Sequence, residues 1–377
     1  MKPHSPQRIL MDHQAFVMQS HGGVSRIFTE IARHFPKDKL NLKVFGGLHI
    51  NAHIQSLQSS NPSLAVGLRV PSLIGKQRLL MPCNRVLLSI FRSLQHPDLV
   101  HYTYFRRTQK RRLNTREVMT VHDMIYELSP ESFQHGDPTP ERKRVMANEV
   151  DGIICVSENT KTDLLRFCDV PDDRVKVIPH GNPMEGVVPK RPNNAPHPFI
   201  LFVGKRGGYK NFSTLLNALS TSNACNHLNI IAFGGEAFSD QERAEIHQKG
   251  LCSRVSHMTG SDEVLAGYYE TARVLVYPSR YEGFGLPPLE AMSLGCPVIV
   301  SKGSSLPEVV GTAGLYFNPD CEQELRAHIE SLNQNEIRSQ LRALGLSRAR
   351  LFSWARCANE TADFYKEVLA RPPRTRE

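Results

Sequence analysis

The sequence VLVYPSRYEGFGLPPLEAMSLGCPVIV, residues 274–300, contains two apolar runs separated by a loop and a helix-forming stretch. The first run ends at Tyr277 and the last begins at Pro297, and both have the β-branched content of buried strands. Between them, Pro287 and Pro288 fit the first turn of a helix, where the missing amide donor is not needed. We therefore expect a strand–loop–helix–strand unit, which is typical of a parallel sheet.

The same alternation of short apolar runs and amphipathic segments recurs on both sides of this unit. It predicts six strands in each half of the chain, at residues 8–16, 42–47, 98–105, 117–123, 152–157 and 175–181, then at 199–204, 228–235, 254–258, 274–279, 297–301 and 314–317. The stretch 181–198 separates the two sets, and its five prolines are incompatible with regular structure.

The predicted fold is therefore α/β, with two Rossmann-like, doubly wound parallel-sheet domains. We expect a first domain at 1–185, a linker at 186–198, a second domain at 199–353, and a C-terminal helix within 354–377 that closes back toward the first domain. Open sheets of this kind bind ligands at the carboxyl ends of their strands, so the active site is expected in a cleft that the two domains face.

Length and composition agree with two ordinary globular domains. The chain has 377 residues, of which 40% are hydrophobic and 22% charged, and these values exclude a disordered or coiled-coil protein. The eight cysteines form no C-x-x-C pair, which argues against a zinc site or a disulfide framework. No apolar stretch reaches about 18 residues, and no apolar signal core is visible, so we expect a cytoplasmic protein.

The formal charge of +9 lies almost entirely in the first half. Residues 1–190 have 26 basic and 18 acidic residues, whereas residues 191–377 have 20 and 19. Such asymmetry predicts an anionic partner for the first half, and nucleic acid, a phosphorylated substrate and a membrane surface all remain open at this point.

The loop in the opening segment has the features of a phosphate site. Its residues Gly283, Phe284, Gly285 and Leu286 present backbone N–H groups where a helix begins, and the helix dipole favours an anion there. Glu282 and Glu290 flank the turn eight residues apart, and a carboxylate is a suitable acceptor for sugar and ribose hydroxyls. In the alternative interpretation, Glu282 is a solvated acid in the loop and Glu290 is an ordinary charge near the N-terminus of the helix.

Three other stretches place polar groups at strand ends. FVGKRGGYKNF, residues 202–212, brings Arg206 and Lys210 to a glycine-rich turn that can neutralise a pyrophosphate, although most such turns are only solvated. His122 follows a predicted strand, but His101, His180 and His257 have similar settings. Gly22 and Gly23 precede an amphipathic helix. A turn of this kind can contact a phosphate, but two glycines before a helix are also a common structural feature.

Together, EGFGLPPLEAM, LPEVVGTAGLYFNP, VSENTKTDLL, FVGKRGGYKNF and HGGVSRIFTEI resemble the retaining glycosyltransferases of family 4, which have the GT-B fold. The resemblance spans residues 20 to 368, and GGYKNF is especially similar to mannosyltransferases that build bacterial surface polysaccharides. It implies that a hexose, mannose from GDP-mannose, is transferred to a hydroxyl of a growing, lipid-linked glycan such as lipopolysaccharide.

The resemblance also implies roles for individual residues. The first domain, 1–185, is expected to bind the acceptor and the second, 199–353, the nucleotide sugar. Glu282, His122, Arg206 and Lys210 are the expected catalytic residues. The donor-binding residues are expected to be Gly22, Gly23, Arg206, Lys210, Glu282, Gly283, Phe284, Gly285, Leu286 and Glu290. No Asp-x-Asp occurs in the chain, so neither a metal nor another cofactor is expected, and the nucleotide sugar is a substrate.

Other functions remain open at the level of sequence: a glycosyltransferase that uses a UDP-sugar, a nucleotide-sugar epimerase on the same fold, a donor-binding protein without activity, and a nucleic-acid-binding protein. The last explains the charge but not the glutamate pair, so no nucleic acid is expected as a partner. The basic run 106–116 and the amphipathic segment 73–94 are candidates for contact with an anionic inner-membrane surface. Alternatively, the run 106–116 is a solvated face and the segment 73–94 packs against the sheet.

Overall fold

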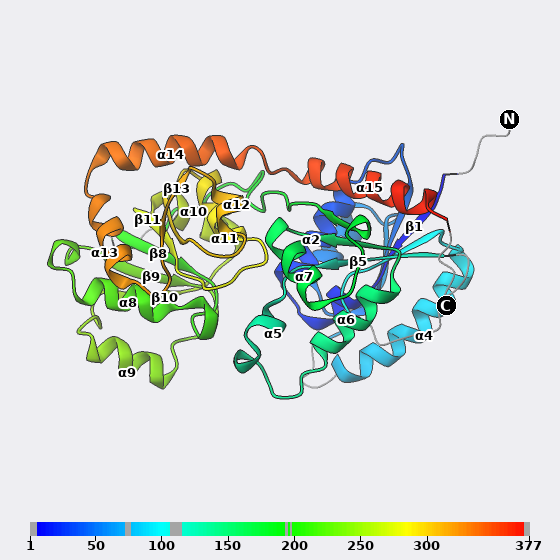
Figure 1. The fold of residues 1–377 in the computed structure, drawn as a ribbon, viewed down its shortest axis with the longest axis horizontal. Helices are drawn as coiled ribbons and strands as arrows, with labels where there is room; N and C mark the ends of the chain where they lie inside the picture. Colours follow the sequence, from blue (N-terminus) through cyan, green and yellow to red (C-terminus); the bar gives the residue numbers. More distant parts are fainter. Residues whose placement is uncertain (1–5, 72–76, 106–114, 193–194, 197, 373–377) are drawn as a thin grey trace. The chain divides into compact units, whose positions relative to one another are not determined.

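The computed structural model describes residues 6–71, 77–105, 115–192, 195–196 and 198–372, and it divides into two units (Figure 1). Unit 1 comprises Met1–Leu128, Phe133–Gly181 and Trp354–Glu377. Unit 2 comprises Ser129–Ser132 and Asn182–Ser353. The described residues between Gly181 and Phe199 form neither a helix nor a strand, in keeping with their proline content.

Unit 1 contains a seven-stranded parallel sheet in the order β3-β2-β1-β4-β5-β6-β7. The neighbours β1 and β4 mark the point at which the strand order reverses, where sheets of this class bind their ligands. Its strands are β1 (Arg8–Met11), β2 (Asn41–His49), β3 (Ala65–Arg69), β4 (Leu99–Tyr102), β5 (Arg116–Val121), β6 (Gly152–Cys155) and β7 (Val175–Val177).

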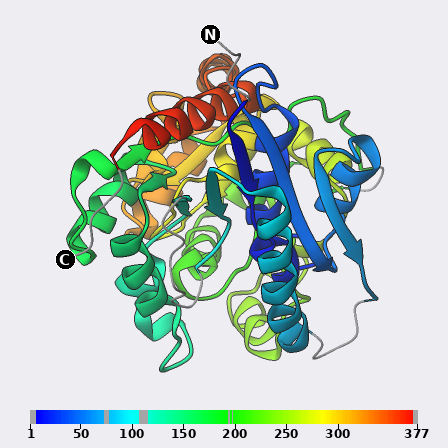
Figure 2. The ribbon, with the colours of Figure 1, turned by 90° about the vertical axis from the view of Figure 1, so that its right-hand side faces the viewer.

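The helices of unit 1 connect these strands, and one further helix comes from the end of the chain. They are α1 (Gln14–Met18), α2 (Gly23–Arg33), α3 (Ala52–Ser60), α4 (Gln77–Gln95), α5 (Ile125–Leu128), α6 (Thr139–Glu149), α7 (Glu158–Phe167) and α15 (Trp354–Ala370). Figure 2 views unit 1 from the side on which α4 lies.

Unit 2 contains a six-stranded parallel sheet in the order β10-β9-β8-β11-β12-β13. Its strands are β8 (Phe199–Val203), β9 (Asn229–Phe233), β10 (Val255–Met258), β11 (Val274–Tyr277), β12 (Val298–Ser301) and β13 (Gly314–Phe317). Its helices are α8 (Phe212–Ser220), α9 (Asp240–Gln248), α10 (Asp262–Thr271), α11 (Leu286–Ser293), α12 (Leu306–Val310), α13 (Glu322–Ser331) and α14 (Asn335–Ala349). The prediction of two Rossmann-like parallel-sheet domains is confirmed.

Two details of unit 1 differ from the sequence expectations. Strand β3 was not predicted, because it is an edge strand whose residues 66–69 are exposed and therefore form no continuous apolar run. The first predicted strand ends early, at Met11. The carboxylate of Asp12 accepts hydrogen bonds from the backbone and hydroxyl of Thr103, at 2.8 and 2.6 Å, and from the side chain of Gln14, where α1 begins.

Helix α15 packs into the core of unit 1, where Trp354, Phe364 and Val368 are buried. A Cβ atom on Gly152 would approach the side chains of Val368 and Phe364 within 2.7 and 2.9 Å, so glycine permits this close contact. The hydroxyl of Tyr365 lies 2.5 Å from Nδ1 of the buried His101. The last helix of the chain therefore belongs to the core of the first unit.

His101, His122 and His180 are among the histidines of unit 1 whose pKa values are lowered mainly by burial. Burial lowers the pKa of His101 to about 3, with a smaller effect from His122. Burial, followed by the charge of Lys143, lowers the pKa of His122 to about 4. The pKa of His180 is lowered by burial and by His122. Unfolding returns all three to values near 6.5.

We predict that unit 1 loses stability as pH falls from 6.5 toward 4, because the unfolded chain then binds protons that the folded chain does not. Each such histidine contributes a slope of about 1.4 kcal/mol per pH unit in this window. Trp354, the chain's only tryptophan, reports on unit 1 by fluorescence during urea unfolding.

The variant His101→Gln removes one titrating histidine and should reduce this slope by about 1.4 kcal/mol per pH unit. The variant His34→Gln changes an exposed residue and should leave the slope unchanged. A free energy of unfolding that stays constant between pH 6.5 and 5 in the wild type would contradict the prediction.

Candidate functional site

The loop between β11 and α11 is built around a glycine in an unusual conformation. Gly285, the N-cap of α11, has φ of 107°, and a Cβ atom there would lie 2.8 Å from the side chain of Leu306. The backbone thus requires glycine at this position. Helix α11 begins at Leu286, with Pro287 in its first turn, so the N–H groups of the loop meet the N-terminus of the helix.

Glu282 and Lys210 form an ion pair in which Nζ of Lys210 lies 2.6 Å from Oε1 of Glu282. The lysine also donates to the hydroxyl of Tyr277 at 3.0 Å, and Ser279 donates to the same carboxylate oxygen. Both side chains of the pair are largely buried. Burial lowers the pKa of Lys210, but Tyr277 and Glu282 outweigh this and raise it, so the ammonium group stays charged.

The backbone around Glu282 is held by two serines that follow β12. The hydroxyl of Ser304 accepts a hydrogen bond from the backbone N–H of Glu282 at 3.0 Å. The hydroxyl of Ser305 lies 2.9 Å from the carbonyl of Glu282 and 2.8 Å from that of Phe284. Hydrogen bonds from the segment after β12 therefore fix the backbone of Glu282.

Glu290, on α11, is only 8% exposed. Its Oε2 accepts a hydrogen bond of 2.8 Å from the hydroxyl of Tyr269, which lies on α10 and is fully buried. The eight-residue spacing places Glu290 on a helix and Glu282 in the preceding loop, as the sequence indicated.

Arg206 has partners within the protein for most of its donors. Its Nε lies 2.7 Å from Glu242, and its terminal nitrogens donate to the backbone carbonyls of Gly234, Glu236 and Ala237. The residue is 7% exposed. This arginine therefore holds the β9–α9 connection against the glycine-rich turn, while Lys205 beside it is exposed.

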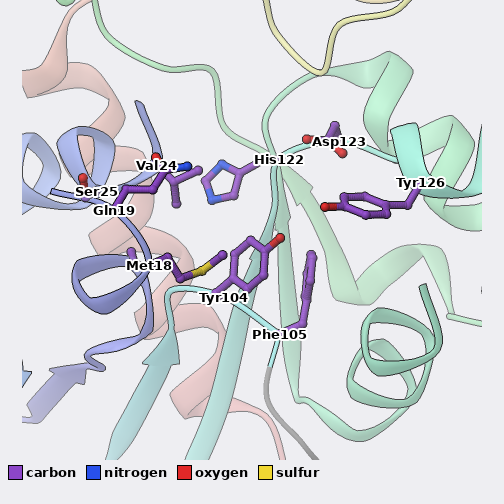
Figure 3. A pocket seen from close by; sticks show the side chains of 10 residues that line it. Met18, Gln19, Val24, Ser25, Tyr104, Phe105, His122, Asp123 and Tyr126 are labelled. Carbon is purple, nitrogen blue, oxygen red and sulfur yellow. The ribbon is translucent and has the colours of Figure 1, made fainter. Parts of the chain in front are cut away.

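Unit 1 contains a pocket of about 210 Å³ near the ends of β4 and β5 (Figure 3). It is lined by Ala15, Met18, Gln19, Val24, Ser25, Tyr104, Phe105, His122, Asp123 and Tyr126. Val24 and Ser25 belong to the first turn of α2, directly after Gly22 and Gly23. The pocket thus joins the predicted glycine loop to His122.

The glycine loop is tightly packed at its first residue. A Cβ atom on Gly22 would approach Oε1 of Gln19 at 2.0 Å, whereas one on Gly23 would meet nothing within 4 Å. The hydroxyl of Ser25 donates to the carbonyl of Gly22 at 2.9 Å. Gly22 is the N-cap of α2, and the space around Cα of Gly23 is open.

Neither ring nitrogen of His122 has a hydrogen-bond partner among the described residues. The ring lies against Phe28, with centroids 5.7 Å apart, and 6.0 Å from His180. Because its pKa is lowered to about 4, the imidazole is neutral at physiological pH. It can donate one hydrogen bond and accept another from a ligand in the pocket.

Two family models match the chain, one described as Glycosyltransferase Family 4 over residues 21–184 and one described as Glycosyl transferases group 1 over residues 187–345. O-antigen chain mannosyltransferase B of Escherichia coli is 30% identical over 367 residues, which cover 91% of this chain and 96% of that protein. The chain belongs to glycosyltransferase family 4.

A further relative is also a mannosyltransferase, and a solved structure shares the fold. The serotype-specific mannosyltransferase WbdA of Escherichia coli is 28% identical over 275 residues, or 67% of this chain, and the match covers 34% of its own length. The structure of a sucrose-phosphate synthase from Thermosynechococcus elongatus has a TM-score of 0.77 at 19% identity, covering 97% of this chain and 100% of that one. This family 4 glycosyltransferase has the GT-B fold.

Within each unit, the structure brings some of the predicted site residues together. In unit 2 these are Lys210, Glu282 and the loop that follows, whereas Arg206 is bound to Glu242. In unit 1 they are His122 and the turn after Gly23. The roles assigned to these residues stay predictions, as do those of Gly22 and Glu290.

Sequence reasoning missed the residues that hold the glutamates, namely Tyr269, Tyr277, Ser279, Ser304 and Ser305. The strand-end position of Tyr277 was a usable signal, because the predicted strand ended there. Within the described ranges, no cluster of three or more histidines, cysteines or acids could hold a metal ion. In the same ranges, no helix is both long enough and apolar enough to cross a bilayer.

We predict that Arg206→Ala destabilises unit 2 of the glycosyltransferase by on the order of 3 kcal/mol, since the variant leaves Glu242 and several carbonyls without their partner. Hydrogen exchange of β9 and α9 under native conditions would measure the loss. Lys205→Ala is the matched control, and this exposed change should stay within about 0.5 kcal/mol. Equal protection in the two variants would rule out the holding role of Arg206.

Proposed function

We propose that this glycosyltransferase transfers mannose from GDP-mannose, with retention of the anomeric configuration, to a hydroxyl of a growing, lipid-linked surface polysaccharide. The observation that carries the proposal is the Lys210–Glu282 pair beside the loop at the start of α11. The choice of mannose rests on the relatives, which are mannosyltransferases of O-antigen synthesis.

Departure of the nucleoside diphosphate leaves negative charge on the β-phosphate and positive charge on the sugar. In this proposal the ammonium of Lys210 and the N–H groups of residues 283–286 stabilise the phosphate charge. Lys210 is already charged and held by Tyr277 and Glu282, so little reorganisation is needed when the charge develops.

The carboxylates then act on hydroxyl groups. Glu282, with its backbone fixed by Ser304 and Ser305, accepts hydrogen bonds from the hydroxyls of the transferred sugar. Glu290 accepts from the ribose. The neutral His122 in unit 1 lies beside the transferred sugar, and the glycine turn at Gly22 contacts the donor phosphate.

We expect Glu282→Gln and Lys210→Ala each to lower kcat/KM for GDP-mannose by roughly 10²- to 10³-fold, the usual cost of one preorganised contact to the developing charge. Because the two residues form a pair, the double variant should lose less than the product of the single losses. Steady-state transfer to a mannose-terminated acceptor is the measurement.

The exposed variants Glu336→Gln and Lys205→Ala serve as controls and should keep wild-type kinetics. Transfer from UDP-sugars but not from GDP-mannose would overturn the donor assignment, and a product of inverted configuration would overturn retention. Near-wild-type turnover in Lys210→Ala would remove the proposed phosphate contact.

The proposed lipid-linked acceptor is supported by the charge of unit 1. Between Lys39 and Arg116 the sequence has 13 basic residues and a single acidic one, Asp98. A basic segment of this kind is attracted to an anionic leaflet by about 1 kcal/mol per residue near the surface. The part of the basic run at 106–114 lies outside the described residues.

Helix α4 adds an apolar surface to this charge. Its residues Val86, Ile90 and Leu94 recur every four positions, so they share one face, and they are 62, 53 and 70% exposed. The opposite side packs on the unit through Leu88 and through Asn84, whose side chain bonds both backbone groups of Leu48. An exposed apolar ridge with basic neighbours suits the interface of a bilayer.

We expect the protein to co-sediment with vesicles that contain anionic phosphatidylglycerol and not with neutral phosphatidylcholine, and to dissociate as salt shortens the Debye length from about 10 Å at 0.1 M to about 3 Å at 1 M. The triple variant Val86→Ser, Ile90→Ser, Leu94→Ser should bind the anionic vesicles more weakly. A second variant, which should also bind more weakly, has serine in place of five basic residues: Arg106, Arg107, Lys110, Arg111 and Arg112.

Leu344→Ser, on an exposed helical position of unit 2, is the control and should bind like the wild type. Sedimentation that ignores lipid charge would contradict the electrostatic proposal. Equal sedimentation of the wild type and both variants would assign the basic run to a solvated face and the acceptor to the soluble phase.

A further inference from the structure

A second pocket, in unit 2, lies at the amino ends of the strands and is rich in arginine. Its volume is about 260 Å³, and it is bounded by the residues before β11 and β12, the turn after α11 and the first half of α14. Three of its lining residues are the arginines Arg273, Arg338 and Arg342, and none of its lining residues is acidic. The pocket therefore brings guanidinium groups together from separate segments.

Arg273 and Arg338 lie close together and share a neutral partner. Nη2 of Arg273 donates to the backbone carbonyl of Leu332 and to the side chain of Asn333, both at 3.0 Å, and Arg338 donates to the same carbonyl. Burial, followed by the charge of Arg338, lowers the pKa of Arg273, so the two cations repel each other. Nε of Arg273 is buried without a hydrogen-bond partner among the described residues. An anion in the pocket would offset this repulsion.

Arg342 reaches the pocket from the next turn of α14. It follows Arg338 by four residues, so the two share one face of the helix. Its Nη1 donates to the carbonyl of Gly295 at 3.1 Å, and its other donors have no partner in the part of the chain that the structure describes. Gly295 has φ of 73°, and a Cβ atom there would lie 2.7 Å from Cζ of Arg342. The glycine therefore leaves room for a guanidinium group that keeps free donors.

Acidic residues do not neutralise the three arginines. Across the described ranges, no carboxylate forms an ion pair with any of them, and outside those ranges the only acidic residue is Glu377, the last of the chain. The hydrogen bond from Arg191, at 2.8 Å, lowers the pKa of Glu270, and the charge of Arg342 contributes less to this shift. Glu270 is therefore already paired with a cation other than the three that line the pocket.

A phosphoryl group matches this arrangement. Guanidinium groups bind phosphate oxygens through two parallel N–H donors, and three such groups can surround one phosphate. The volume is below the ~300–1,000 Å³ of pockets that enclose drug-sized ligands, so a small anion fits better than a whole nucleotide sugar. Residues 191–377 have 20 basic and 19 acidic residues, so the half of the chain that holds the pocket is not generally basic. A local charge of this kind favours a small ion over an extended anionic surface.

This pocket is separate from the Lys210–Glu282 pair. Arg273 directly precedes β11, whereas Tyr277, which bonds Lys210, is the last residue of that strand. A strand of four residues spans about 13 Å, so one phosphate group cannot contact both Arg273 and Lys210. The arginines are therefore not explained by the diphosphate of the proposed donor.

We propose that Arg273, Arg338 and Arg342 form a second anion site of unit 2, which binds the phosphoryl group of a small soluble compound. Arg338 and Arg342 donate to its oxygens from one face of α14, and Arg273 donates from the start of β11. The site does not depend on the proposed transfer reaction, and its occupation can be measured without donor, acceptor or turnover.

Isothermal titration calorimetry of the full chain with inorganic phosphate at low ionic strength tests the site. The double variant Arg338→Gln, Arg342→Gln should raise the Kd for phosphate at least tenfold. Arg342→Lys keeps the charge but loses the paired donors, so its Kd should lie between those of the double variant and the wild type. Arg350→Gln, an exposed arginine directly after α14, is the matched control and should bind like the wild type.

The variant Lys210→Ala separates the two anion sites of unit 2, and it should leave the Kd for phosphate unchanged. Loss of phosphate binding in Lys210→Ala, with normal binding in the double variant, would assign the ion to the loop before α11 and overturn the proposal. Absence of phosphate binding to the wild type would also overturn it. Because Arg338 and Arg342 also bond backbone carbonyls, thermal unfolding without phosphate checks that the variants stay folded.

Two further measurements identify the source of the phosphoryl group. Glycerol 3-phosphate should displace inorganic phosphate from the wild type, since a soluble monoester presents the same oxygens. Co-sedimentation with phosphatidylglycerol vesicles should be equal for the wild type and the double variant. Weaker sedimentation of the double variant, together with no competition by glycerol 3-phosphate, would assign the arginines to a lipid headgroup and overturn the soluble ligand.

Discussion

Every strand pair in the two sheets is parallel, and this constraint decides where polar groups collect in the protein. Parallel strands are joined by crossover connections rather than hairpins, so the carboxyl ends of all strands in a sheet meet at one edge. Tyr277 is the last residue of β11, and His122 and the turn that contains Lys210 follow the ends of β5 and β8. The helices cover the faces, which leaves this edge as the usual place for ligands.

The charges of the site are arranged differently in the two units. In unit 2, Lys210 and Glu282 are mutually neutralised before a ligand arrives, so a phosphate must share the ammonium with a carboxylate that stays in place. In unit 1, burial lowers the pKa values of His101, His122 and His180, so these imidazoles stay neutral at physiological pH.

Arg206 and Lys210 show that residue type and position in the sequence do not decide which partners a side chain has. Both are cations on the same glycine-rich turn, four residues apart. Arg206 forms an ion pair with Glu242, which lies 36 residues later on α9. Lys210 instead bonds Tyr277, at the end of β11, and Glu282, in the loop that follows it. The partners come from segments distant in sequence, and only the packing of α9 and β11 around β8 determines which cation receives which acid.

The sequence by itself determined the fold class, twelve of the strands and the helix that starts beside Pro287, because period, proline position and glycine content act locally. It also indicated the glutamate pair and the strand-end histidine. The tertiary structure alone decided the exposed edge strand β3, the early end of β1 at Asp12, and the hydrogen bonds that hold Glu282. It alone formed the pocket that joins the first turn of α2 to His122. Those features depend on contacts between segments tens to hundreds of residues apart, which a local pattern does not encode.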